Sequence, residues 1–165
     1  MKDQKKIKPK KKFGDVQFIW GMLCSISSID QEKNNISLFS VLEQFNLPEQ
    51  FFIESNKQRD TPVLFPIPYE IVLSLRRTLS IQISGEEIPL DLKIKNIDSS
   101  GKSIQELLFQ ISFPKDLKRL RIRIPVPGVI VTNPGDYSYQ IEVKTSHDVD
   151  FRKVLEIPLE ITMVK

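Results

Sequence analysis

The chain has one cysteine, Cys24, and one histidine, His147, in 165 residues. A lone cysteine excludes an intrachain disulfide, and such usage is typical of a reducing compartment. A zinc site needs about four cysteine, histidine or carboxylate ligands, and Cys24 lies far from His147. We therefore expect a cytoplasmic protein without metal or other cofactor. A loop-borne calcium cluster is the alternative, although no motif dictates it, and its candidates are Asp91, Asp98, Asp116, Asp136, Asp148 and Asp150.

Glycine is also scarce, and none of the six glycines belongs to a phosphate-cradling loop. A catalytic base needs a nucleophile and an orienting group within hydrogen-bond reach. His147 lies in the polar loop TSHDVD, and nothing in the sequence supplies it with either. Cys24 alternates with Trp20 and other apolar residues, so its thiol is expected to be buried. We predict no catalytic residues and no enzyme activity; a site built from loops 46–62 and 145–150 is the alternative.

Long apolar runs are missing as well. The longest candidate, VQFIWGMLCSIS (16–27), is too short to span a bilayer. Asp15 and Gln17 interrupt its beginning, and no small-residue cleavage site follows it. It therefore does not match a secretory signal. We expect no insertion into a membrane.

Charge is present but unevenly distributed. The net charge is +3, yet residues 1–12 hold seven lysines and one aspartate, a local charge of +6, which leaves −3 for the remainder. We expect residues 1–13 to form a disordered basic tail, which attracts nucleic acid or anionic lipid weakly and without sequence specificity. A purely solubilising extension is the alternative. The candidate tail contacts are Lys5, Lys6, Lys8, Lys10, Lys11 and Lys12.

Apolar and polar residues alternate with a period of two through most of residues 14–165. About eight short strands without a longer helical period predict an all-β fold, a single antiparallel β-sandwich domain of immunoglobulin-like or C2-like type. Segment 36–45 is apolar on both faces and is predicted to be a central strand. Pro158 predicts a sheet edge or a bulge in the last strand. The expected strands are 16–26, 36–45, 69–83, 90–95, 107–113, 119–126, 137–143 and 155–163.

The segment TNPGDYSYQIEV (132–143) places Tyr137 just after a Pro-Gly turn. In β-sandwiches, a tyrosine at this place can bond its hydroxyl to the backbone a few residues upstream. Tyr139 shares the parity of Tyr137 and is expected to fill the inter-sheet position where immunoglobulin domains keep a disulfide cysteine. Trp20 and Cys24 are predicted to be structural too, on one face of the first strand with Val16.

Arg119, Arg121 and Arg123 form a row along one face of a predicted strand, with a spacing of about 6.6–6.8 Å. Such a row can grip phosphates or an acidic protein segment through bidentate contacts. A solvated face, or an edge kept charged against aggregation, is the alternative. The row is the candidate binding surface of the predicted domain.

Three further segments carry a resemblance to a family. The hairpin FIWGMLCSISSIDQEKNNISLFSVLEQFNLP, then VLFPIPYEIVLSL and PGDYSYQIEV, resemble a family of small bacterial β-sandwich proteins with a domain of unknown function. The resemblance runs from about residue 16 to the end and implies a β-sandwich fold and a bacterial origin, but no activity. Ser25 stands where the family often has aspartate, and Ser40 where it commonly has glycine.

The leading functional hypothesis is a non-enzymatic interaction or accessory protein, because a complete core pattern coexists with no convergent reactive groups. Its expected partner is another protein, which the sequence does not identify. The alternative is binding of nucleic acid or an anionic surface through the lysine tail.

Overall fold

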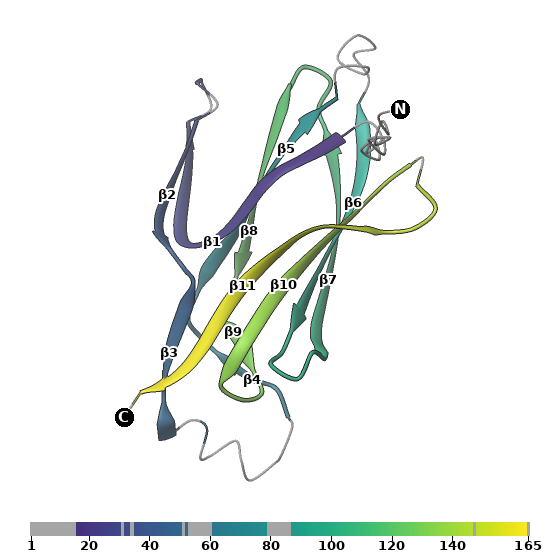
Figure 1. Cartoon of the computed structure of the whole chain (residues 1–165). Coiled ribbons are helices and arrows are strands. Elements are labelled where there is room, and N and C mark those ends of the chain that lie inside the picture. Colours follow the sequence, from purple (N-terminus) through teal and green to yellow (C-terminus); the bar gives the residue numbers. More distant parts are fainter. Residues whose placement is uncertain are drawn as a thin grey trace, which may run out of the picture.

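The structure is a computed structural model, and it describes residues 16–30, 32–33, 35–50, 52, 61–78, 87–146 and 148–164. The described strands form three sheets (Figure 1): sheet A in the order β2-β1-β5-β8, sheet B in the order β3-β11-β10-β6-β7, and sheet C, which pairs β4 with β9. The predicted all-β fold is confirmed, whereas the expected basic tail, residues 1–13, and His147 lie outside the described residues. The strands are β1 (Val16–Asp30), β2 (Asn35–Val41), β3 (Gln44–Pro48), β4 (Val63–Phe65), β5 (Tyr69–Arg77), β6 (Ile88–Ile97), β7 (Ser103–Phe113), β8 (Arg119–Val126), β9 (Val129–Val131), β10 (Gly135–Thr145) and β11 (Arg152–Val164).

The strands outnumber the sequence-based expectation of about eight, for two physical reasons. Strands β4 and β9 have three residues each, too few for a period of two to be recognised. Segment 36–45 is not one strand but contributes to both β2 and β3. The pairing also departs from a purely antiparallel arrangement, because β3 pairs with β11 in parallel while the other neighbouring strands pair antiparallel.

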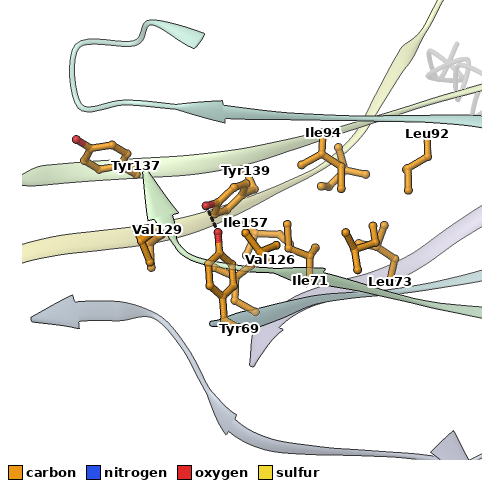
Figure 2. Packing of buried hydrophobic residues seen from close by; sticks show 14 of the residues in the cluster. Tyr69, Ile71, Leu73, Leu92, Ile94, Val126, Val129, Tyr137, Tyr139 and Ile157 are labelled. Carbon is orange, nitrogen blue, oxygen red and sulfur yellow. Dashed lines mark hydrogen bonds between the residues drawn. The ribbon is translucent and has the colours of Figure 1, made fainter. Parts of the chain in front are cut away.

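The buried sides of sheets A and B share one hydrophobic core. Ile71 and Leu73 on β5 point toward Leu92 and Ile94 on β6 (Figure 2), and all four side chains are almost fully buried. At about 25 cal/mol for each Å² of apolar surface removed from water, this shared core is the main favourable contribution to folding.

Two tyrosines connect the sheets inside this core. The hydroxyl groups of Tyr69 on β5 and Tyr139 on β10 are hydrogen-bonded to each other (Figure 2). Burial raises the pKa of Tyr139 to about 12 and raises the pKa of Tyr69 as well. Tyr139 thus occupies an inter-sheet position, as the sequence predicts, and its buried hydroxyl is satisfied by a partner in the other sheet.

Tyr137 forms the expected corner at the start of β10. Its hydroxyl donates to the carbonyl oxygen of Asn133 at 2.6 Å and accepts from the backbone N–H groups of Thr132 at 2.9 Å and Asn133 at 3.0 Å. Gly135 has a φ of 140°, and a Cβ there would lie 2.8 Å from the side chain of Ser99, so this turn requires glycine. The corner joins β9 of sheet C to β10 of sheet B.

The first strand corrects one expectation. The sequence pattern places Val16, Trp20 and Cys24 on a single inward face, but β1 changes register between Phe18 and Trp20. A β-bulge adds one residue and so reverses which side chains point inward. After the bulge Leu23 belongs to the core, whereas Cys24 is buried outside it.

The prediction of a central strand at 36–45 is wrong. Ser40 has a φ of 50°, and the chain leaves sheet A after Val41, the last residue of β2. It re-enters as β3, so that this apolar segment forms one edge of each sheet. Its apolar residues on both faces therefore reflect a change of sheet rather than a central position.

The prediction for Pro158 is met in part, because β11 is not an edge strand but lies next to the edge strand β3, and its register with β10 shifts at Ile141 and Glu142. Strand β11 has a neighbour on both sides over part of its length, but its pairing with β3 covers only Glu160 to Val164. Pro158 pairs with Ser138 of β10 and precedes that parallel segment. Among the described residues, no strand needs an N–H donor from Pro158 on its other side.

Candidate interaction surface

Strand alternation gives sheet A an outer face, which lies opposite to the shared core. On β5, Ile71, Leu73 and Leu75 belong to the core. The intervening residues of β5 and their cross-strand neighbours on β1 and β8 therefore point outward. We call the following set the outer face of sheet A: Trp20, Met22, Cys24, Glu70, Val72, Ser74, Arg76, Arg119, Arg121, Arg123 and Pro125.

The register arranges these residues in rows across three strands. Met22 on β1, Val72 on β5 and Arg123 on β8 are successive cross-strand partners. An apolar side chain and an arginine therefore lie at opposite ends of this row. Trp20 and Arg121 flank Ser74 in the same way.

Arg123, at one end of the predicted row, is held by an acidic partner. Its guanidinium nitrogen Nη2 lies 2.8 Å from Oε1 of Glu70, and its Nε lies 3.4 Å from Oε2. The hydrogen bond from Arg123 holds the pKa of Glu70 below its ordinary value, aided by Ser27, whose hydroxyl also donates to this carboxylate. Glu70 is therefore ionised near neutral pH, and its negative charge largely neutralises the charge of Arg123.

Among the described residues of the outer face, Arg76 and Arg119 form no ion pair with an acidic group. Arg119 is exposed and lies opposite Arg76 of β5, which is exposed too. The Nε of Arg76 donates to the side-chain oxygen of Gln17 at 2.8 Å, a neutral partner. Arg121 is partly buried beside Ser74. The sequence pattern identifies Arg119, Arg121 and Arg123 as a row but does not include Arg76 and Glu70. Alternation predicts that Arg76 and Glu70 point outward, but it does not predict which residues of β8 lie beside them.

Exposed apolar side chains continue this surface onto β1 and β2. Ile26 is 56% exposed and lies opposite Phe39, which is 53% exposed. Met22 and Val41 are exposed as well, and Val41 lies opposite Cys24. We call Met22, Ile26, Phe39 and Val41 the apolar strip. Strand β1 bends strongly before its hairpin with β2 (Figure 1), so the strip lies on an arm of the molecule.

A recess of about 440 Å³ lies where the apolar strip meets the outer face of sheet A. Ile26 and Glu70 line it from β1 and β5, and Pro125 lines it from β8. Its walls combine the carboxylate of Glu70, which is paired with Arg123, with apolar and proline side chains.

The outer face is not solvated throughout. Cys24 and Val72 are fully buried although neither belongs to the shared core, and Ser74 is buried with them. Burial raises the pKa of the Cys24 thiol, with a further increase from Glu70. The thiol is therefore protonated near neutral pH and serves as a small packing group rather than a nucleophile.

The other groups considered from the sequence have local structural roles. Burial opposes ionisation of Asp98, but hydrogen bonds from Ser100, Lys102 and Thr132 hold its pKa below the ordinary value. Asp98 Oδ1 accepts from the backbone N–H groups of Ser100 and Lys102, both at 2.9 Å. Asp148 accepts from the backbone and hydroxyl of Thr145.

These carboxylates do not converge on a metal site. In the part of the chain that the structure describes, no three histidine, cysteine or acidic residues are grouped to hold a metal ion. A polar recess of about 430 Å³ lies beside Asp98 and Lys102, but the carboxylate of Asp98 is already occupied by the hydrogen bonds of its own turn.

Comparison with known proteins adds no assignment. No protein-family model matches the chain, and a search of the curated proteins finds no significant match. None of the helices that the described residues form has the length and apolar character needed to cross a bilayer.

Proposed function

We propose that the chain is a non-enzymatic interaction protein that binds an acidic segment of a protein partner on the outer face of sheet A. The observation that carries this proposal is the imbalance of charge there: among the described residues of this face, Arg76 and Arg119 lie opposite each other, while the single glutamate, Glu70, is bonded to Arg123. Guanidinium groups bind carboxylates through two parallel hydrogen bonds. The partner's acidic side chains would neutralise Arg76 and Arg119.

The composition of the apolar strip also supports this proposal. Arginine, methionine and aromatic residues are enriched at protein interfaces, whereas lysine and glutamate are depleted. Met22, Ile26 and Phe39 are exposed on the same sheet as the arginines, and no lysine is present in β1, β2, β5 or β8. An extended partner with acidic and apolar residues in alternation matches both parts of the surface.

The experiment compares two double charge reversals with equal net charge. The partner is captured from the native host, purified, and titrated with each variant in a calorimeter. Arg76→Glu/Arg119→Glu should weaken binding at least about tenfold, because attraction becomes repulsion. Lys144→Glu/Lys153→Glu in sheet B should leave the affinity within about twofold. Equal weakening by both variants, or no reproducible partner for the wild-type chain, would refute the proposal.

The type of fold and the family are part of this proposal. We infer that sheets A and B form one immunoglobulin-like or C2-like β-sandwich covering residues 14–165, supported by the shared core and by the inter-sheet pair of Tyr69 and Tyr139. The segments VLFPIPYEIVLSL and PGDYSYQIEV support membership of the small bacterial family that they resemble. Cys24 fits a reducing cytoplasm, which fractionation of the native host would test.

A second candidate function rests on the local charge of +6 in residues 1–12. We propose that the lysine tail contributes weak, non-specific binding to nucleic acid. With four to seven phosphates engaged, the slope of log affinity against log salt should be about −3.5 to −6. Deleting residues 2–12 should abolish the salt-sensitive retardation of DNA or RNA in a gel. Unchanged retardation would remove the tail from consideration.

A further inference from the structure

Strand β7 forms an open edge of sheet B. It is the last strand in the order of that sheet, and no other strand of the described residues pairs with its outer side. It spans 11 residues, SIQELLFQISF, with one charged residue, Glu106, and no proline. Such an edge exposes unpaired N–H and C=O groups that can pair with another chain.

The other three edges of sheets A and B carry features that discourage pairing. Strand β8 has its arginine row and Pro125, and β3 has only five residues and ends at Pro48. Strand β2 contains Ser40, whose φ of 50° interrupts the extended backbone. Proteins commonly protect sheet edges with charges, prolines, short strands and irregularities. By this comparison β7 is the unprotected edge.

The side chains of β7 are also incompletely covered. Leu108 points away from the core and is 61% exposed. Leu107, Phe109 and Ile111 pack against the core but are only partly buried. A strand added beside β7 would cover apolar side chains on both of its faces.

We propose that β7 pairs antiparallel with β7 of a second copy of this chain, with Leu108 at the two-fold axis. In an antiparallel pair, residues equally far from the axis lie opposite each other and point to the same face. Leu108 then lies opposite Leu108, and Glu106 lies opposite Gln110, whose amide can donate to its carboxylate. On the inner face Leu107 lies opposite Phe109, which pairs two partly buried apolar groups.

Glu106 can accept a hydrogen bond from Gln110 of the second copy and keep its ion pair with Lys93. Its Oε1 lies 3.7 Å from Nζ of Lys93 on β6, and half of its side chain is exposed. A carboxylate has enough lone pairs to accept from a lysine and an amide together. The dimer joins the two copies of sheet B edge to edge and does not involve the outer face of sheet A, so this inference is independent of the proposed partner.

A pair of lysine substitutions tests the register by sedimentation of the full chain. Leu108→Lys places two positive charges opposite each other and should raise the dissociation constant of the dimer at least about tenfold. Gln110→Lys instead faces Glu106 of the second copy and should keep the dimer. Both positions are exposed, and circular dichroism checks that both variants fold. A wild-type chain that is monomeric at millimolar concentration, or equal dissociation constants for the two variants, would overturn the inference.

Cysteine substitution tests whether the two-fold axis lies at Leu108. Under a mild oxidant, Leu108→Cys should give a disulfide-linked dimer on a non-reducing gel, because the two thiols lie directly opposite each other. Gln110→Cys should not, because its nearest opposite residue is Glu106. The native Cys24 is fully buried and is common to both variants. Equal cross-linking of both variants, or of neither, would contradict an axis at Leu108.

Discussion

The outer faces of sheets A and B arise from the same alternation but differ in chemistry. On sheet B, charges occur in opposed pairs: Lys95 Nζ lies 2.8 Å from Glu142 Oε1, and Lys93 lies near both Glu142 and Glu106. On the described part of sheet A, Arg76 and Arg119 lie opposite each other, the single glutamate, Glu70, is bonded to Arg123, and exposed apolar residues continue the surface. Sheet B thus has an outer face with paired opposite charges, whereas the outer face of sheet A combines an excess of positive charge with exposed apolar side chains.

The outer faces of sheets A and B also differ in how deeply their side chains are buried. On sheet A, Cys24, Val72 and Ser74 are buried on the side opposite to the core. In sheet B, the outward residues of β6, such as Asp91, Lys93 and Lys95, are only partly buried. Alternation therefore predicts which side chains leave the core, but not whether water or another part of the chain covers them.

The largest expected change in stability comes from placing a negative charge on the outer face of sheet A, with the same change on sheet B as the comparison. Val72→Asp puts an unpaired carboxylate at a fully buried position of sheet A and should lower the free energy of unfolding by at least about 3 kcal/mol. Gln140→Asp in sheet B should cost less than about 1 kcal/mol, because repulsion from Glu156 on one neighbouring strand is offset by Lys95 on the other. Urea unfolding followed by circular dichroism measures both. Equal losses would show that the two outer faces do not differ in burial.

A smaller effect should follow from removing one cation from each face. Arg123→Ala leaves the carboxylate of Glu70 without its arginine and should cost about 1–2 kcal/mol. Lys95→Ala should cost less than about 1 kcal/mol, because Lys93 remains 4.0 Å from Glu142. Denaturant midpoints at low salt compare the two variants. A larger loss for Lys95→Ala would reverse the comparison.

The pairing of Glu70 should make its contribution depend on pH. Its folded-state pKa is lowered by Arg123, so the stabilisation is complete above the unfolded pKa of about 4.3 and is lost as pH falls through the folded pKa. At neutral pH, the free energy of unfolding of the wild-type chain should exceed that of Glu70→Gln by about 1 kcal/mol. This difference should shrink as the pH is lowered below about 4.3. A difference that stays constant between neutral and acidic pH would exclude the Glu70–Arg123 pair as its cause.

The smallest effect on stability is expected in the apolar strip. Phe39→Ser removes a side chain that is 53% exposed and should change the free energy of unfolding by no more than about 0.5 kcal/mol. The same variant should bind the partner less tightly, since it loses apolar contact area. Calorimetric titration measures the binding, with Leu64→Ser of β4 as an exposed control outside the strip. A large loss of stability would assign Phe39 to the fold rather than to the interface.

The regular strands could be predicted because each directs alternate apolar side chains toward the core. Leu90, Leu92 and Ile94 are almost fully buried, as their spacing indicates, and the arginines of β8 alternate with inward residues as expected. The tyrosine corner was recognisable because a local turn and one side chain determine it. These features depend on residues close together in sequence.

The remaining features depend on contacts between distant residues. The bulge after Phe18 reverses the facing of β1, and the switch between sheets after Val41 follows an unusual backbone conformation at Ser40. The pairing of Glu70 with Arg123 joins residues 53 positions apart. Alternation gives the direction of each side chain but not the register between strands, and so it cannot identify such pairs.

The most direct test of the central claim is nuclear magnetic resonance titration of the labelled chain with a synthetic peptide that alternates glutamate with leucine. We expect the largest amide shift changes on the outer face of sheet A, around Ser74, Arg119 and Arg121. A peptide with lysine in place of glutamate should leave these signals unchanged. Shift changes centred on the outer face of sheet B, or equal changes with both peptides, would refute the binding of an acidic segment on the outer face of sheet A.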